Sequence, residues 1–403
     1  MTEMTVVSAD DVAVAAADAN GADAAKPADI AAAETDVDLQ TLSTLRPVAG
    51  GLGVAWSGLS VTIHTPTGAL VAAVRPCSFV AGAGRTLAVM GSTGSGKTTL
   101  LSALAHRGPY STGTISFVAE GRSAREPWSK TMKREIGFIT QDDVVWPELT
   151  VRQSLCFTAR LRLGLNAAEA AARVGVVLEV LRMARVADNR IGSVAVRGLS
   201  GGERKRLCIG TELVTGPRLL FCDEPSSGLD SSMAVIVVKV LREVSRLGIG
   251  VVSSIHQPSS VLFALFDDVC FLEQGQLMYA GEAAKLGAYF GDLGHPTPHG
   301  HATTDWVMDL LVFDRLNANA KAAVAKDNAC EAGAVDGAAG RGGALGGAAA
   351  YSAVSFEADL YSSSAWEQTK VLLQREWLME RPKLWQPQTL KMMCGIALII
   401  SII

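Results

Sequence analysis

Short, largely apolar runs alternate with helical patterns over residues 53–313. The runs cover residues 86–90, 135–140, 219–222 and 250–255, between glycines or polar residues. Strands of this kind are typical of a sheet that is buried on both faces, as parallel sheets are. Residues 150–198 have a mostly helical pattern, which predicts a separate helical lobe. The pattern therefore predicts an α/β core with parallel strands.

The segments on either side of this core have different patterns. Residues 1–48 are rich in alanine and acidic residues and contain no aromatic residue. We expect a disordered tail there, because it cannot bury enough apolar surface to offset the entropy cost of ordering. Residues 315–355 are rich in alanine and glycine, which predicts a flexible linker.

Residues 356–403 combine a helical pattern with an apolar run. Within residues 356–390 we expect an amphipathic helix that carries Trp366, Leu373 and Trp377 on one side. The run MMCGIALIISII is too short to span a bilayer, which takes about 20 residues. We interpret residues 391–403 as the start of a first transmembrane helix, with the preceding basic residues on the cytoplasmic side. A helix buried in the soluble domain is the alternative.

Composition and charge narrow the class of protein. The chain has 403 residues, of which 49% are apolar, so disorder of the whole chain is excluded. The net charge is −4, but residues 1–40 hold nine acids and one base, which leaves the remainder at +4. Neither value predicts a nucleic-acid partner. The 7 cysteines contain no C-x-x-C motif, and the first 30 residues lack a signal-peptide pattern; both features predict a reduced, cytosol-facing chain.

A phosphate-binding loop follows the apolar run 86–90. Residues 91–98 read GSTGSGKT and fit G-x-x-x-x-G-K-[ST], with a helical pattern directly after them. The glycines allow backbone N–H groups to turn around phosphate oxygens, next to a helix N-terminus. We expect Lys97 to reach the β- and γ-phosphates and Thr98 to bind Mg²⁺. The predicted ligand is a nucleoside triphosphate with magnesium, bound by Gly91, Ser92, Thr93, Gly94, Ser95, Gly96, Lys97, Thr98 and Thr99.

Two acids follow the apolar run 219–222. Asp223 is placed to hold the Mg²⁺ shell, and Glu224 is placed to polarise an attacking water. An acid pair that only caps the next turn is the alternative. The upstream phosphate loop favours the catalytic interpretation, because it supplies a ligand for the pair to act on.

The segment LSGGE at residues 199–203 resembles the signature motif of the ATP-binding cassette (ABC) ATPases. The resemblance implies a P-loop NTPase fold for residues 49–314, with a parallel-sheet core, an antiparallel β subdomain and a helical subdomain. It also implies further roles. Gln141 resembles the Q-loop glutamine, which contacts Mg²⁺ and water and couples to a membrane partner; residues 227–230, ending in Asp230, resemble the D-loop; and His256 resembles the switch histidine. The implied catalytic residues are thus Gln141, Glu224 and His256, and the implied Mg²⁺ ligands are Thr98, Gln141 and Asp223.

The signature segment also predicts a partner. Ser200, Gly201, Gly202 and the following helix N-terminus could cradle a γ-phosphate. In proteins of the resembled family, that phosphate belongs to the ATP of the other subunit, and the resemblance also implies that Asp230 is a nucleotide-binding residue, together with Ser200, Gly201 and Gly202. One cassette per chain therefore implies a second half-transporter chain, as a homodimer or a heterodimer. Residues 204–206 are interpreted as the exposed, dimer-facing start of the signature helix.

Five longer stretches resemble the G, or White-type, half-transporters: 141–151, 200–214, 223–231, 255–267 and 279–294. This resemblance implies ATP-driven export of a lipophilic substrate across a membrane, with the cassette facing the cytosol. One departure concerns adenine. Near Val61, where many cassettes have a stacking aromatic residue, Trp56 is the only nearby ring. A soluble ABC-type ATPase switch and a short isoform that does not transport are the alternatives.

Overall fold

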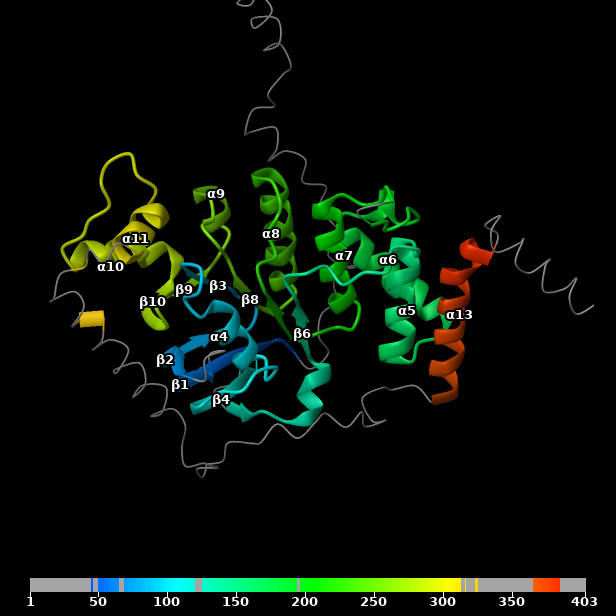
Figure 1. Ribbon diagram of the computed structural model, residues 1–403, viewed down its shortest axis with the longest axis horizontal. Helices are drawn as coiled ribbons and strands as arrows, with labels where there is room; N and C mark the ends of the chain where they lie inside the picture. The colour runs from blue at the N-terminus through cyan, green and yellow to red at the C-terminus, as the bar shows by residue number, and fades with distance from the viewer. Residues whose placement is uncertain are drawn as a thin grey trace, which may run out of the picture. The chain divides into compact units, whose positions relative to one another are not determined.

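The computed structural model describes residues 45, 50–64, 69–119, 125–193, 196–312, 316, 323–324 and 365–384 (Figure 1). Nearly all of the predicted acidic tail, nearly all of the linker and residues 391–403 lie outside the described residues. The described strands and α-helices are β1 (Leu52–His64), β2 (Leu70–Ala81), β3 (Thr86–Gly91), α4 (Lys97–Leu104), β4 (Thr112–Ala119), β5 (Arg125–Pro127), β6 (Ile136–Ile139), α5 (Val151–Leu163), α6 (Ala167–Val180), α7 (Gly201–Leu213), β7 (Leu219–Cys222), α8 (Ser231–Arg246), β8 (Gly250–Ser254), α9 (Ser260–Phe263), β9 (Asp268–Glu273), β10 (Gln276–Glu282), α10 (Leu286–Asp292), α11 (Thr303–Val312) and α13 (Ala365–Leu384).

A six-stranded sheet forms the centre of the fold. Its strand order is β10-β9-β3-β8-β7-β6. The strands from β9 to β6 pair in parallel, and the edge strand β10 pairs antiparallel with β9. The four apolar runs form β3, β6, β7 and β8, and every residue within these four strands is buried. Their apolar sequence is continuous because both faces of the sheet are covered. The predicted parallel α/β core is thus confirmed.

Alternate residues of the sheet face two different layers. Val89, Phe221 and Val252 pack with α4 and with the second sheet in one cluster. On the other face, Leu220 and Val251 pack with α8 and with helices α5 to α7. This alternation follows from the two-residue period of a strand. The alternation places α4 on one face of the sheet and the helical lobe on the other. α4 follows the predicted phosphate-binding loop of residues 91–98, called the glycine loop below.

The second sheet is antiparallel, with strand order β2-β1-β4-β5. Its largest core side chains are Trp56 and Phe117, which are nearly or fully inaccessible to solvent. Trp56 also makes an edge-to-face contact with Phe79, with ring centroids 5.7 Å apart. This sheet is the antiparallel β subdomain that the family resemblance implies.

The helical lobe contains α5, α6 and α7, which contact one another (Figure 1). α5 and α6 begin with reciprocal capping boxes, formed by Thr150 with Gln153 and by Asn166 with Glu169. Such caps satisfy two orphan N–H groups at each helix start. The predicted helical subdomain is therefore present between β6 and β7.

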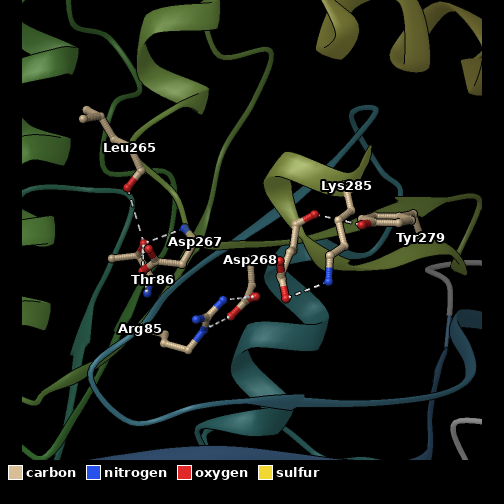
Figure 2. Close-up of polar contacts among 8 residues, drawn as sticks. Arg85, Thr86, Leu265, Asp267, Asp268, Tyr279 and Lys285 are labelled. Carbon is tan, nitrogen blue, oxygen red and sulfur yellow. Dashed lines mark hydrogen bonds and ion pairs between the residues drawn. The ribbon is translucent and has the colours of Figure 1, made fainter. Parts of the chain in front are cut away.

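An ion pair and a side-chain cap fix strand register at the edge of the sheet where β3 and β9 begin (Figure 2). Arg85 makes two hydrogen bonds of 2.7 Å to the Asp268 carboxylate, which is largely buried. Thr86 donates its backbone N–H and its hydroxyl to Asp267 at 2.9 Å. These contacts lie at the strand ends opposite to the glycine loop, and they hold β3 and β9 in the register that sets the loop's position.

α13 lies within residues 356–390, where we expected an amphipathic helix, and one of its faces is packed. Val371 and Met379 are buried, and α13 contacts α5. Trp366 and Leu373, which we expected together on one side of the helix, are 66% and 63% exposed. None of the helices in the described part of the chain is both long enough and apolar enough to span a membrane.

Candidate active site

The glycine loop connects β3 to α4, and its backbone requires glycine. Gly91, Gly94 and Gly96 have φ values of 150°, 80° and 102°, a region that other residues rarely adopt. A Cβ atom at Gly96 would collide with the Ala73 carbonyl oxygen, and one at Gly91 would collide with that of Leu272. Gly96 is also the N-cap of α4 and supplies no side-chain cap. The first turn of α4 is therefore open to an anion at its N–H groups.

Lys97 lies inside this loop. Its ammonium donates to the carbonyl oxygens of Gly91 (3.0 Å) and Ser92 (2.8 Å). Burial lowers the pKa of Lys97, while the nearby carboxylates of Glu224, Asp223 and Glu273 act in the opposite direction. A cation held by loop carbonyls, next to the helix N-terminus, fits an anionic phosphate chain.

Asp223 joins the glycine loop to the end of β7. Its Oδ1 accepts hydrogen bonds from the Thr98 hydroxyl (3.0 Å) and the Ser254 hydroxyl (2.7 Å). A hydroxyl and a carboxylate oxygen in direct contact are hard ligands of the type that Mg²⁺ takes, together with phosphate oxygens. Thr98 and Asp223 therefore fit a magnesium ion beside the loop.

Glu224 follows in a strained conformation, with φ of 45°. Its backbone N–H donates to the Ser254 hydroxyl at 2.7 Å, and its carboxylate accepts from the Gln141 side chain at 3.0 Å. His256 Nε2 lies 2.8 Å from the Thr93 hydroxyl of the glycine loop. Gln141, Glu224 and His256 thus lie around the glycine loop, although they are far apart in the sequence.

The sheet explains why these residues meet. The glycine loop, His256, the acid pair and Gln141 follow β3, β8, β7 and β6, which are consecutive parallel neighbours. Parallel strands end at one edge of a sheet, and ligands bind there in open α/β folds. The topology therefore brings four segments together at the carboxyl edge.

Ser200 and Asp230 have a different position. Ser200 caps α7 in a capping box with Glu203, and Asp230 caps α8 by accepting from the backbone N–H groups of Ser232 and Met233. The Ser232 hydroxyl also donates to the Asp230 carboxylate. This bond is the main cause of the lowered pKa of Asp230, and the backbone bonds act in the same direction. A Cβ at Gly201 would approach Leu229, and one at Gly202 would approach Met233, so the signature tip lies against the start of α8. Within the described residues, no hydrogen bond or ion pair joins Ser200 or Asp230 to the glycine loop.

Three side chains of the site could not be found from sequence motifs. Ser254 is an ordinary polar residue at the end of an apolar strand, yet it contacts both acids. Glu273 accepts from the Ser92 hydroxyl at 3.0 Å. Lys205 is only 2% exposed, so the interpretation of residues 204–206 as an exposed helix start is wrong for this residue. Trp56, the ring nearest to the expected adenine position, is buried inside the second sheet. It therefore offers no face for adenine.

Two family models match the chain. Residues 74–227 match the ABC transporter model, and residues 256–326 match the ABC-2 type transporter model. The first match contains the glycine loop, Gln141, the signature segment and the acid pair. The chain belongs to the ABC transporter family. ABC transporters are ATPases coupled to transport, and the nucleotide-binding cassette of the family is the fold described above.

Similar curated proteins are G family members from Arabidopsis thaliana. ABC transporter G family member 21 is 44% identical over 232 residues, which cover 56% of this chain and 34% of that protein. ABC transporter G family member 13 is 40% identical over 279 residues, which cover 67% of this chain and 40% of that protein. This ABC chain therefore spans between a third and two-fifths of the length of these two relatives.

Proposed function

We propose that this chain is the ATP-binding and ATP-hydrolysing cassette of a half-size membrane transporter that exports a lipophilic substrate. The observation that carries the proposal is the junction at Asp223. There the Thr98 hydroxyl, at the end of the glycine loop, donates a hydrogen bond to the Asp223 carboxylate, which follows β7. This bond joins the proposed phosphate-binding segment to the proposed catalytic acid pair. The similarity to G family members supports the coupling to transport.

In this proposal each side chain has one task at the carboxyl edge. The glycine loop and Lys97 bind the phosphates, and Thr98 and Asp223 hold Mg²⁺, with Gln141 reaching it once nucleotide is bound. When bound, Mg²⁺ neutralises phosphate charge and orients the phosphate oxygens. Glu224 orients and polarises the attacking water, and it is held by Gln141 through the 3.0 Å hydrogen bond. His256 contacts the γ-phosphate from its position beside Thr93.

The proposal includes a second cassette. Ser200, Gly201 and Gly202 form a helix N-terminus on the helical lobe, and such a terminus favours a phosphate. We propose that it meets the ATP held by the glycine loop of a partner chain, with Asp230 in the same interface. Two nucleotides would then lie between two chains arranged head to tail, and hydrolysis would open the pair. The proposed site of action is a membrane, with the cassette on its cytosolic side.

The variant Glu224→Gln tests the assignment of the base. It keeps the size and the contact with Gln141 but removes the charge that polarises water. We expect ATP affinity within about threefold of the parent and a hydrolysis rate reduced by about 100-fold or more, which is the scale of a lost general base. Glu179→Gln is the matched control, because Glu179 is exposed on α6.

Steady-state phosphate release and equilibrium binding of a fluorescent ATP analogue are the measurements. A Glu224→Gln chain that hydrolyses ATP at the parent rate contradicts the assignment of Glu224. A parent chain that does not bind Mg·ATP contradicts the proposed function as a whole.

A further inference from the structure

We infer that Lys205 is a positioning residue: it couples the signature helix α7 to Gln141 and, through Gln141, to the carboxylate of Glu224. The inference rests on the proposed function, because it concerns the alignment of the proposed catalytic group. It assigns to Lys205 a role that the motif pattern did not indicate.

The Lys205 ammonium is buried and contacts two groups of the segment after β6. Its side chain is 3% exposed, and Nζ lies 2.7 Å from Asp143 Oδ1. Nζ also donates to the backbone carbonyl oxygen of Gln141 at 2.8 Å. A buried ammonium is costly unless it is paired and hydrogen-bonded. The two partners therefore hold this segment firmly against α7.

The same segment holds the proposed base. Lys205 binds the backbone of Gln141, and the side chain of Gln141 donates to Glu224 Oε2 at 3.0 Å. Two consecutive hydrogen bonds thus lead from α7 to the carboxylate. Cys208, one turn further along α7, adds a weak 3.7 Å contact from its thiol to Asp143.

The other end of this connection is the signature tip. Ser200 is the N-cap of α7, and Lys205 lies five residues further, so one rigid helix carries both. A phosphate that binds at the N-terminus of α7 and shifts the helix would therefore also move Gln141. Through Lys205, phosphate binding at the signature tip (Ser200, Gly201 and Gly202) would therefore change the alignment of Glu224.

The neighbouring basic residues on α7 have different contacts. Arg206 donates to the carbonyl oxygen of Leu181 in the helical lobe at 3.2 Å, and Arg204 donates to that of Leu199 at 3.3 Å. Arg206 is half-buried, and among the described residues it makes no hydrogen bond or ion pair with Gln141 or Asp143. It therefore serves as a matched control on the same helix.

The test compares Lys205→Met, Lys205→Arg and Arg206→Met in the whole chain. Methionine is unbranched and only one atom shorter than lysine, and it removes the charge and the donors. We expect Lys205→Met to lower kcat for ATP hydrolysis about tenfold or more, with KM and ATP affinity within about twofold of the parent. Lys205→Arg should recover part of kcat, because it restores a cation. Arg206→Met should leave amide exchange over residues 141–146 at the parent rate, because Arg206 contacts the Leu181 carbonyl oxygen.

A double mutant separates positioning from a general loss of stability. If Lys205 acts through Gln141, the chain with both Lys205→Met and Gln141→Ala should be no slower than the slower single variant. Multiplicative effects of the two substitutions overturn the inference, and so does a Lys205→Met variant with the parent kcat. A rise in KM with kcat unchanged overturns it as well.

Hydrogen exchange provides a readout that does not need turnover. Lys205→Met should speed amide exchange over residues 141–146 about tenfold or more, and leave exchange in β7 at the parent rate. Unchanged exchange over residues 141–146 overturns the inference. If exchange responds as expected but the parent chain neither binds nor hydrolyses ATP, the proposed function fails while the link from Lys205 to Gln141 stands.

Discussion

Replacing Ser254 with alanine should destabilise the cassette far more than its small size suggests. The hydroxyl is fully buried and makes two contacts: it donates to Asp223 Oδ1 at 2.7 Å and accepts from the Glu224 N–H at 2.7 Å. Alanine leaves the Glu224 N–H without that acceptor and removes one of the two hydrogen bonds that Asp223 Oδ1 accepts from Thr98 and Ser254. It also releases the backbone that holds Glu224 at positive φ.

The magnitude follows from the two contacts. A buried polar group that loses its partner costs about 1–3 kcal/mol, and a bond to a charged group lies at the upper end of this range. We therefore expect Ser254→Ala to lower the free energy of unfolding by about 2–4 kcal/mol. For a domain of this size, each kcal/mol corresponds to roughly 2–4 °C in Tm, so Tm should fall by about 4–16 °C.

Ser253 provides a matched control one residue earlier on β8. It is equally buried, but its hydroxyl makes no hydrogen bond of good geometry to the described residues and lies near the Cys222 thiol. Ser253→Ala should change the free energy of unfolding by less than about 1 kcal/mol, because it removes an unsatisfied group. Differential scanning calorimetry of both variants without nucleotide is the assay. Equal shifts in Tm for the two variants would refute the reasoning.

Three further predictions concern other parts of the chain. Gly96→Ala should abolish ATP binding, because the new Cβ collides with the Ala73 carbonyl oxygen at positive φ, as equilibrium binding would show; affinity within threefold of the parent contradicts this. Gly175→Ala should instead stabilise the chain by about 0.5–1 kcal/mol in chemical denaturation, because this glycine lies in α6 with open space around it; a loss of stability contradicts it. Burial lowers the pKa of His106 from 6.5 to about 4. Between these pH values the imidazole is protonated in the unfolded chain and neutral in the folded chain, so the free energy of unfolding decreases as pH falls from 6.5 to 4. The loss is at most about 3 kcal/mol and about 2 kcal/mol after solvent screening of the partly exposed ring; His106→Gln should flatten this pH dependence, and an unchanged slope contradicts it.

The sequence predicted the core of the fold because its strands are buried on both faces. Each of the four apolar runs became a strand of the central sheet, with ends displaced by at most one residue. The glycine loop was predictable as well, since its backbone needs residues without a Cβ at fixed spacing. Local sequence therefore determined the elements and the loop at the carboxyl edge.

The contacts between strands could not be predicted in the same way. Ser254 meets Asp223 only because β7 and β8 pair in parallel with Cys222 opposite Ser253. Lys205 lies between two arginines, and nothing local to α7 distinguishes it from them. Its burial depends on the segment after β6, which is more than 60 residues away. Both contacts are tertiary, so periodicity and motif spacing carry no signal for them.

The most direct test of the nucleotide site is the retention of ATP by the Glu224→Gln chain. The variant is incubated with Mg·ATP, passed through gel filtration and analysed for mass and bound nucleotide. We expect the mass of two 42.2 kDa chains with one ATP retained per chain. A single-chain mass under saturating Mg·ATP, or no retained ATP, contradicts the proposal that two cassettes enclose nucleotide between the glycine loop and the signature helix.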